Sequence, residues 1–301
     1  MAESSHGFEA TKARITLVLL SLGWGVTWPI MRIALSEIPP FSMRVGSLFV
    51  GAVTLAVLAR WQGHNLAIRS PKAWAHIFVA SLLNIVSFSV LIPFAQLAAE
   101  TSRVAILVYT MPIWAALLAW PILGERLTAS RVAGLVLCIA GMVVLIAPLM
   151  AFGIPVGILL ALAGGISWAA GTVYLKWAHI DCDPLAATTW QLVFGFLVVI
   201  VCVPIFEGSL HLWPVSMQAF LAIVFIGFVG SGLAFFVWFE IVRRLPAMTA
   251  SLGVLSVPVV GVVSSMLMLG EQPTIADVVG FSLMLAASAC VLLRPQEPLS
   301  V

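Results

Sequence analysis

The stretch LGERLTASRVAG at residues 123–134 returns as LGEQPTIADVVG at residues 269–280. The two stretches are 146 positions apart, and the same offset aligns Pro112 with Pro258 without a gap. Similarity at a fixed spacing within one chain is the signature of an internal repeat. The pair of stretches therefore indicates that the chain holds two copies of one unit.

The first part of each copy repeats as well, at a slightly shorter offset. Trp24 aligns with Trp168 at a spacing of 144 positions. Taken with the later matches, this alignment extends the similarity over most of each half. The sequence therefore predicts a first repeat at residues 1–150 and a second repeat at residues 151–301.

The composition is that of a membrane protein. Of the 301 residues, 62% are hydrophobic and only 9% are charged, whereas about a quarter of the residues in soluble domains are charged. The net charge is only +2, and the basic residues stand in short clusters between apolar runs. Such clusters indicate membrane orientation and not a nucleic-acid surface. We expect a lipid bilayer as the surroundings and no nucleic acid as a partner.

Ten runs approach the ~20 residues that a helix needs to cross a bilayer. They are 15–35, 42–60, 73–95, 102–122, 129–148, 155–177, 185–205, 217–241, 246–269 and 275–293. Each copy would then hold five helices, and an odd number makes the second copy enter the membrane from the opposite side. The predicted fold is an all-α integral membrane protein with ten transmembrane helices as two inverted five-helix repeats. Inverted repeats allow a site between the halves to open alternately to the two sides.

The basic residues predict the orientation. With a cytoplasmic N-terminus, most of the 14 basic residues lie on the cytoplasmic side, as the positive-inside rule requires. These are Lys12, Arg14, Arg60, Arg69, Lys72, Arg126, Arg131, Lys176, Arg243, Arg244 and Arg294. Both termini are therefore predicted to be cytoplasmic. Arg32, Arg44 and Arg103 fall toward the other face near helix ends, where the simplest interpretation is snorkelling to the interface.

The repeated Leu-Gly-Glu phrase has a structural interpretation. Its glycine would end a helix, and its glutamate would lie in a turn near the surface. Thr274 and Asp277 have the spacing of a helix N-cap, and Thr128 can cap in the same manner. We expect a tight turn between helices, and a direct role in substrate binding is the alternative.

Catalytic motifs are missing from the sequence. It has no His-Glu-x-x-His, no Gly-x-Ser-x-Gly and no Gly-x-x-x-x-Gly-Lys phosphate loop. The four cysteines show no paired spacing and are interpreted as packing residues. The prediction is a protein that is not an enzyme and that uses neither a cofactor nor a metal.

The charged residues within the predicted helices limit the class of solute that the protein could bind. No Asp or Glu stands in the middle of a helix, and Glu240 falls at a helix end beside Arg243. Ionisable residues inside a membrane are costly and are usually kept for function. A nearly uncharged centre favours neutral, zwitterionic or amphipathic solutes, and it argues against obligatory proton coupling through a buried acid.

Two tryptophans are the main candidates for recognition. Trp24 and Trp168 lie in the middle of predicted helices at matched positions. A pseudo-twofold axis would place them on opposite sides of one cavity, where they could sandwich an aromatic or aliphatic group. Tryptophans that merely pack or face lipid are the alternative.

A few polar residues at mid-depth complete the predicted binding site. They are Asn84, Ser87, Tyr109, Tyr174 and Ser251. Among them, Asn84 could hydrogen-bond the carboxylate or ammonium of an amino acid. An interhelical hydrogen bond is the alternative role for this amide.

The matched prolines are the predicted hinges. Pro112 and Pro258 each leave a carbonyl without its usual helical partner. A bend at these positions would suit a pair of gates that open in turn.

These motifs together resemble the drug/metabolite transporter superfamily, in its ten-helix EamA branch. The resemblance is carried by WGVTWPIMR, YTMPIWAAL, LSVPVVGVV and the two LGE phrases, and it covers essentially the whole chain. It implies a central cavity lined chiefly by helices 1, 3, 4, 6, 8 and 9. By overall similarity, without a diagnostic motif, the chain looks most like the bacterial aromatic amino-acid exporters.

The function implied by this resemblance is secondary transport across the cytoplasmic (inner) membrane of a bacterium. The expected partner is a small molecule, an aromatic or other neutral amino acid or a similar hydrophobic metabolite, and a homodimer is an open alternative to a monomer. A multidrug or purine-type exporter is the competing transport function. A membrane scaffold that transports nothing is the competing class, and it predicts packed helices without a polar-lined cavity.

Overall fold

The computed structural model describes residues 2–125, 127–150, 156–244, 246–247, 250–251, 254–272 and 274–292, and in these ranges all regular secondary structure is helical. Eight of the described helices are long and apolar enough to cross a membrane. Val257–Leu269 and Ile275–Ala287 are shorter apolar helices. The protein is thus an all-helical, multi-pass membrane protein.

The helices of residues 2–150 lie where apolar runs predict them. In chain order they are α1 (Ala2–Leu35), α2 (Pro40–Trp61), α3 (Pro71–Ser81), the π-helix η1 (Leu82–Val86), α4 (Ser87–Ala98), α5 (Thr101–Val108), α6 (Met111–Leu123) and α7 (Ala129–Met150). Pro40 and Pro71 open their helices, a position where the missing N–H has no intrahelical partner to lose.

The helices of residues 2–150 form a first series, and those of residues 156–292 form a second series in the same order. It comprises α8 (Val156–Ala178), α9 (Pro184–Phe206), α10 (Met217–Phe225), the π-helix η2 (Ile226–Leu233), α11 (Ala234–Arg244), α13 (Val257–Leu269) and α14 (Ile275–Leu292). The π-helices begin at Leu82 and Ile226, which are 144 positions apart. The spacing of the early repeat is therefore also the spacing of these two irregular turns.

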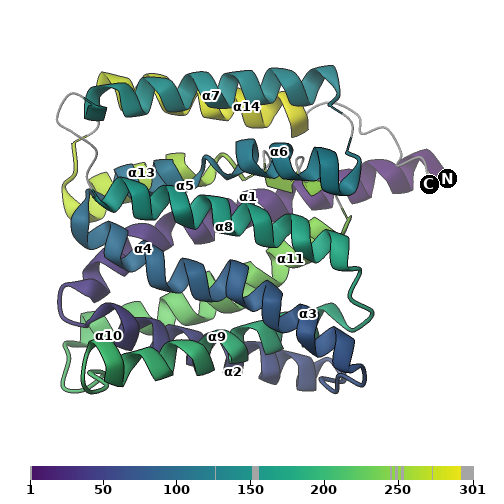
Figure 1. The fold of residues 1–301 in the computed structure, drawn as a ribbon. Coiled ribbons are helices and arrows are strands. Elements are labelled where there is room, and N and C mark those ends of the chain that lie inside the picture. Colours follow the sequence, from purple (N-terminus) through teal and green to yellow (C-terminus); the bar gives the residue numbers. More distant parts are fainter. Residues whose placement is uncertain are drawn as a thin grey trace.

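Sequence expectations about helix boundaries were wrong in several places. The first helix was expected over residues 15–35, but α1 begins at Ala2, and its first turns project beyond the bundle in Figure 1. The helix expected over residues 102–122 is interrupted at Tyr109 and Thr110, where α5 ends and α6 begins. Pro112 lies just after this break, in the first turn of α6, where a proline ring does not disturb the helix.

The helices pack in pairs that join the two series. α1 lies against α13 and α8 against α5 and α6, while α2 packs on α9 and on η2. α7 and α14 pack mainly on each other, and they form a separate layer at the top of Figure 1. The axes of the described long helices are roughly aligned across the view, as expected of a transmembrane bundle.

Glycine permits the close contact between α2 and η2. A Cβ atom on Gly227 would lie 2.5 Å from the Val50 Cβ and 2.7 Å from the Ser47 carbonyl oxygen. Small residues at such crossings let two helix backbones approach. Side chains here would force the helices apart.

We expect Gly227→Ala to destabilise the protein by about 1–3 kcal/mol, the usual cost of overpacking, because backbone atoms would have to move. Gly23→Ala is the matched control, since its new Cβ would meet only the Val229 Cγ1, at 3.2 Å. Thermal unfolding in detergent measures the difference. Equal melting temperatures for the two variants would contradict this account of the crossing.

The Leu-Gly-Glu phrases end helices as predicted. Gly124 and Gly270 terminate α6 and α13 in the left-handed conformation, with φ of 66° and 71°, which glycine adopts without a steric cost. The cap before α14 is confirmed as well. Its Thr274 backbone N–H donates to the Asp277 carboxylate at 2.6 Å, and the Asp277 N–H donates to the Thr274 hydroxyl at 3.2 Å.

The position of the glutamates was predicted less well. Glu125 was expected near the surface, but it is only 8% exposed, and it accepts the Ala247 backbone N–H at 2.6 Å. Glu271 accepts the N–H groups of Thr101 and Ser102, both at 3.2 Å, at the start of α5. Each glutamate of one series thus caps a helical segment of the other, and the two caps repeat with the spacing of 146.

Candidate substrate-binding site

A cavity lies where α1, α2, α4, α8, η2 and α11 meet the break between α5 and α6. Its lining comprises Trp24, Thr27, Trp28, Met31, Arg44, Phe88, Val108, Tyr109, Met111, Trp168, Ile226, Gly230, Ser231 and Phe235. The open volume is about 50 Å³, room for a few water molecules. A larger solute would require the aromatic lining to move apart.

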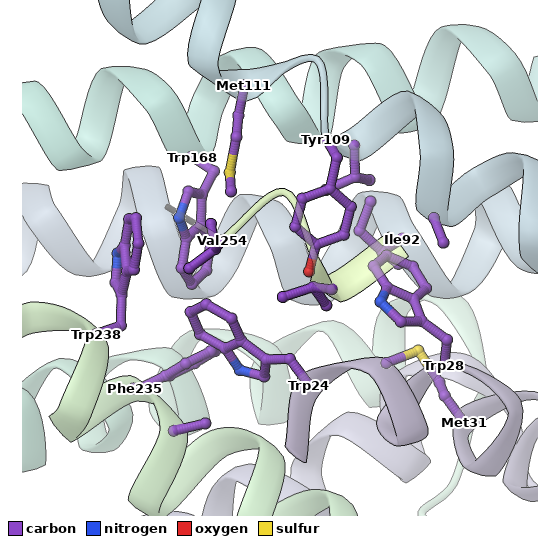
Figure 2. Close-up of a cluster of buried hydrophobic side chains, with 14 of the residues drawn as sticks. Trp24, Trp28, Met31, Ile92, Tyr109, Met111, Trp168, Phe235, Trp238 and Val254 are labelled. Atoms are coloured by element: carbon purple, nitrogen blue, oxygen red, sulfur yellow. The ribbon is translucent and has the colours of Figure 1, made fainter. Parts of the chain in front are cut away.

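The two matched tryptophans meet in this cavity, but not as the sequence predicted. Trp24 and Trp168 do not stand apart across a gap, because their ring centroids are 5.7 Å apart at an interplanar angle of 84°. Figure 2 shows the two rings directed toward each other from α1 and α8. This edge-to-face contact is favourable for aromatic pairs. The pair therefore closes the space that a flat solute would occupy.

Further aromatic rings surround the pair. Trp168 lies 5.1 Å from Phe88 and 5.3 Å from Phe235, measured between centroids. The Trp24 indole N–H donates to the Gly230 carbonyl at 3.1 Å, which ties α1 to η2. The Trp168 indole N–H is buried and has no hydrogen-bond partner within the described residues. It is a donor available to a solute.

Tyr109 also lines the cavity, as the sequence analysis proposed. The break between α5 and α6 places it there, and its ring lies 6.3 Å from that of Trp28. Trp28 was not among the predicted site residues. A signal for it existed, because it follows Trp24 by four positions and so shares its helix face.

Asn84 and Ser87 lie outside the lining. Asn84 is buried in η1 against α8, where a Cβ on Gly171 would approach its amide to 2.5 Å. Its Nδ2 donates to the Ala80 carbonyl at 3.3 Å, and its Oδ1 has no partner among the described residues. The Ser87 hydroxyl donates to the carbonyl of Leu82, the first residue of the π-helix η1, at 2.7 Å, so this hydroxyl has its partner within the same helical stretch.

Tyr174 and Ser251 are also not in the lining. The Tyr174 hydroxyl, in the last turns of α8, lies 2.7 Å from the Nδ1 of His76 in α3. Ser251 is 1% exposed and lies before α13. The structure therefore brings Trp24, Tyr109 and Trp168 together, and it leaves the other four predicted polar residues elsewhere in the bundle.

The two prolines predicted as hinges follow matching interruptions. Pro112 is the second residue of α6, after the turn at Tyr109 and Thr110. Pro258 is the second residue of α13, after a turn at residues 254–256. A helix can bend at such an interruption. The role of the two prolines as hinges stays a prediction.

Arg44 is a second cavity-lining residue that was not predicted from the sequence. It was expected to snorkel to the interface, yet it is only 2% exposed and lines the cavity. A signal was present, because Ser47 and Gly51 follow it at helical spacing and form the small-residue face of α2. Since this face packs inward, a residue one turn earlier on it points inward too.

The lining contains a single charged residue, Arg44, and no carboxylate among its described members. Within the described chain, no three His, Cys, Asp or Glu residues are grouped to hold a metal ion. The arrangement is suited to binding an amphipathic molecule between aromatic rings and hydrogen-bond donors.

Several bacterial proteins with names of transporters resemble the chain over most of its length. A "probable terminal-alkyne amino-acid exporter" of Streptantibioticus cattleyicolor is 25% identical over 92% of this chain and 92% of its own length. A "probable amino-acid metabolite efflux pump" of Salmonella typhimurium is 26% identical over 89% and 91%. The transporter YoaV of Bacillus subtilis is 27% identical over 89% and 92%.

The fold also matches a solved crystal structure. The two chains share 21% of their residues, the match covers 94% of this chain and 97% of that one, and the TM-score is 0.75. The EamA-like transporter family matches residues 11–147 and again residues 155–293. Members of this family are transporters and not enzymes. Because these two matches, one in each half, together span nearly the whole length, the chain belongs to the EamA-like transporter family.

Proposed function

We propose that this transporter exports aromatic and other neutral amino acids, or similar hydrophobic metabolites, by alternating access. The observation that carries the proposal is the cavity itself, in which Trp24, Trp28, Tyr109 and Trp168 converge beside one arginine. Aromatic rings bind flat apolar groups through their faces and edges. Polar donors at the same site can bind the charged end of an amino acid.

The relatives supply independent support for the substrate class. The proteins of Salmonella typhimurium and Streptantibioticus cattleyicolor are named for amino-acid efflux and amino-acid export. Their identity to this chain is low, so the preference for aromatic side chains rests on the cavity alone.

Alternating access would use two inverted repeats, at residues 1–150 and 151–301. Support comes from features that recur at the repeat spacing: the two π-helices, the two left-handed glycines, and the two reciprocal glutamate caps. Bending beside Pro112 and Pro258 would let each half open one end of the bundle. The tight closure of Trp24 on Trp168 suits a state between the two open ones.

The proposed setting is the inner membrane of a bacterium, with ten crossings and both termini cytoplasmic. The distribution of basic residues supports this orientation. Two of them, Arg126 and Arg294, lie outside the described residues. The working assembly would be a monomer or a homodimer.

Counterflow in liposomes tests the substrate class. Purified protein with internal unlabelled phenylalanine should accumulate labelled phenylalanine, and external tryptophan or methionine should compete, whereas lysine should not. Failure with every neutral amino acid, in protein that unfolds cooperatively, would overturn the substrate proposal. Flux of a purine or a cationic drug under the same conditions would favour the competing exporter functions, and a scaffold would carry none of them.

A further inference from the structure

We infer that Arg44 binds the carboxylate of the transported solute, and that the site therefore selects aromatic or apolar carboxylates whether or not they carry an ammonium group. This inference rests on the proposed function for the location of the site. It goes further by naming the group that is recognised. Aromatic amino acids would be one subset of the substrates, together with their deaminated analogues.

The burial of Arg44 is the first argument. A guanidinium keeps its positive charge under all ordinary conditions, and a charge buried without a partner is strongly unfavourable. Arg44 is only 2% exposed, and among the described residues its Nε–H finds no acceptor and no carboxylate pairs with it. The structure tolerates this charge at the edge of a cavity, where an anion could reach it.

Two acidic residues at or close before the start of α2, Glu207 by contact and Glu37 by sequence, bind other groups. Glu207 reaches the start of α2, but its oxygens accept the backbone N–H groups of Phe41, at 2.6 Å, and Ser42, at 2.9 Å. Glu37 accepts the N–H of Ser216 at 2.8 Å and also its hydroxyl. Neither carboxylate neutralises Arg44.

The other polar groups of the lining favour an anion as well. The Trp168 indole N–H is a buried donor without an acceptor in the part of the chain that the structure describes. The Thr27 hydroxyl already donates to the Gly23 carbonyl at 2.8 Å, and the Gly230 carbonyl already accepts from Trp24. Within the described residues, the lining atoms that are buried without a partner are thus two donors, the Trp168 indole N–H and the Arg44 Nε–H. An ammonium group would be matched by a carboxylate, and the described lining holds none. The cavity complements the carboxylate of an amino acid and offers its ammonium no matching charge.

The apolar part of the same solute has its own contacts. Trp24, Phe88 and Trp168 form the aromatic wall of the cavity that Arg44 lines. An arginine fork can bind a carboxylate through two parallel hydrogen bonds. The site would accordingly recognise a ring at the wall and a carboxylate at α2.

Two analogues of phenylalanine separate the recognised groups. In the counterflow assay, 3-phenylpropionate, which lacks the ammonium, should compete within about threefold of phenylalanine. Phenethylamine, which lacks the carboxylate, should not compete. Competition by phenethylamine without competition by 3-phenylpropionate would overturn the inference, even with phenylalanine transport intact.

Variants connect this preference to the arginine. Arg44→Gln should weaken competition by 3-phenylpropionate by about tenfold or more, as the loss of a charged partner predicts. Arg44→Lys keeps the charge without the fork and should lose less. Arg103→Gln is the matched control, because that arginine is exposed and pairs with Glu100 at 2.7 Å. Unchanged competition in both Arg44 variants would overturn the assignment.

Ligand-induced thermal stabilisation distinguishes this inference from the proposed function. 3-Phenylpropionate should raise the melting temperature of the wild-type protein and of Arg103→Gln, but not that of Arg44→Gln. If 3-phenylpropionate stabilises the protein in this way but no amino acid is transported, the inference of a carboxylate site holds and the proposed function as an amino-acid exporter is wrong. If Arg44→Gln does not fold, the same comparison is made with Arg44→Lys, for which an undiminished shift would contradict the inference.

Discussion

Trp168→Ala is expected to reduce phenylalanine counterflow by at least about tenfold, the loss expected when a central aromatic contact is truncated. The side chain is 4% exposed and lies within 5.7 Å, centroid to centroid, of Trp24, Phe88 and Phe235. Its removal would take away both the edge-to-face partner of Trp24 and a free indole donor. The concentration for half-maximal counterflow should rise along with the fall in rate.

Loss of packing is a separate effect, and it needs its own control. Burial alone makes a Trp-to-Ala change cost about 3–5 kcal/mol of stability. Trp238→Ala is a matched control because Trp238 is 0% exposed and lies 5.6 Å from Trp24 and 6.3 Å from Trp168, yet it does not line the cavity. Trp168→Phe keeps a ring and removes the N–H.

The expected pattern is a similar drop in melting temperature for both alanine variants, with solute affinity lost only in Trp168→Ala. Trp168→Phe should lie between the wild type and Trp168→Ala in affinity. If Trp238→Ala loses affinity as severely as Trp168→Ala, the tryptophan cluster acts through packing and Trp168 is no recognition residue.

The sequence predicted the helices because apolar length and repeat spacing are local or periodic properties. The interruptions at Tyr109 and at residues 254–256 were not predicted. A proline in a first helical turn cannot be told from a proline in a helix interior when no other residue marks the break. Figure 2 shows the consequence, with Tyr109 directed into the cluster from the break. The general position of the cavity followed from the matched tryptophans, but not their contact.

The side-chain partners were harder to predict than the helices. Arg44 has the position along the chain that snorkelling requires, and only the direction of its helix face reveals its burial. Asn84 is a plausible ligand by depth, but its position against Gly171 depends on how α8 packs on η1. Depth can be estimated from one sequence, whereas the facing direction depends on the neighbouring helices.

Removal of the two reciprocal glutamate caps is expected to loosen the bundle at opposite ends. Each carboxylate accepts backbone N–H groups at a helix start, where the unpaired donors and the helix dipole favour negative charge. A lost cap typically costs about 0.5–2 kcal/mol. In the proposed inverted arrangement, the helices that end at Gly124 and Gly270 run in opposite directions, so the caps of Glu125 and Glu271 should act on different ends of the same cavity.

Hydrogen exchange with mass spectrometry measures the loosening at each helix start. Glu125→Ala should accelerate exchange in the segment that holds Ala247 and leave the start of α5 unchanged. Glu271→Ala should accelerate exchange at Thr101 and Ser102 alone, because these amides lose their acceptors. Glu100→Ala is the control, as its carboxylate pairs with Arg103 and caps no helix of the other series.

Transport should respond to the caps as well. If the closing of each end of the bundle requires its glutamate, either alanine variant should slow counterflow. Because the caps are independent sites, the double variant should slow counterflow by no more than the product of the two single effects. Faster exchange at both ends in each single variant would instead mean that the caps form one cooperative unit. The two halves would then not open in turn, and alternating access by separate gates would have to be abandoned for this protein.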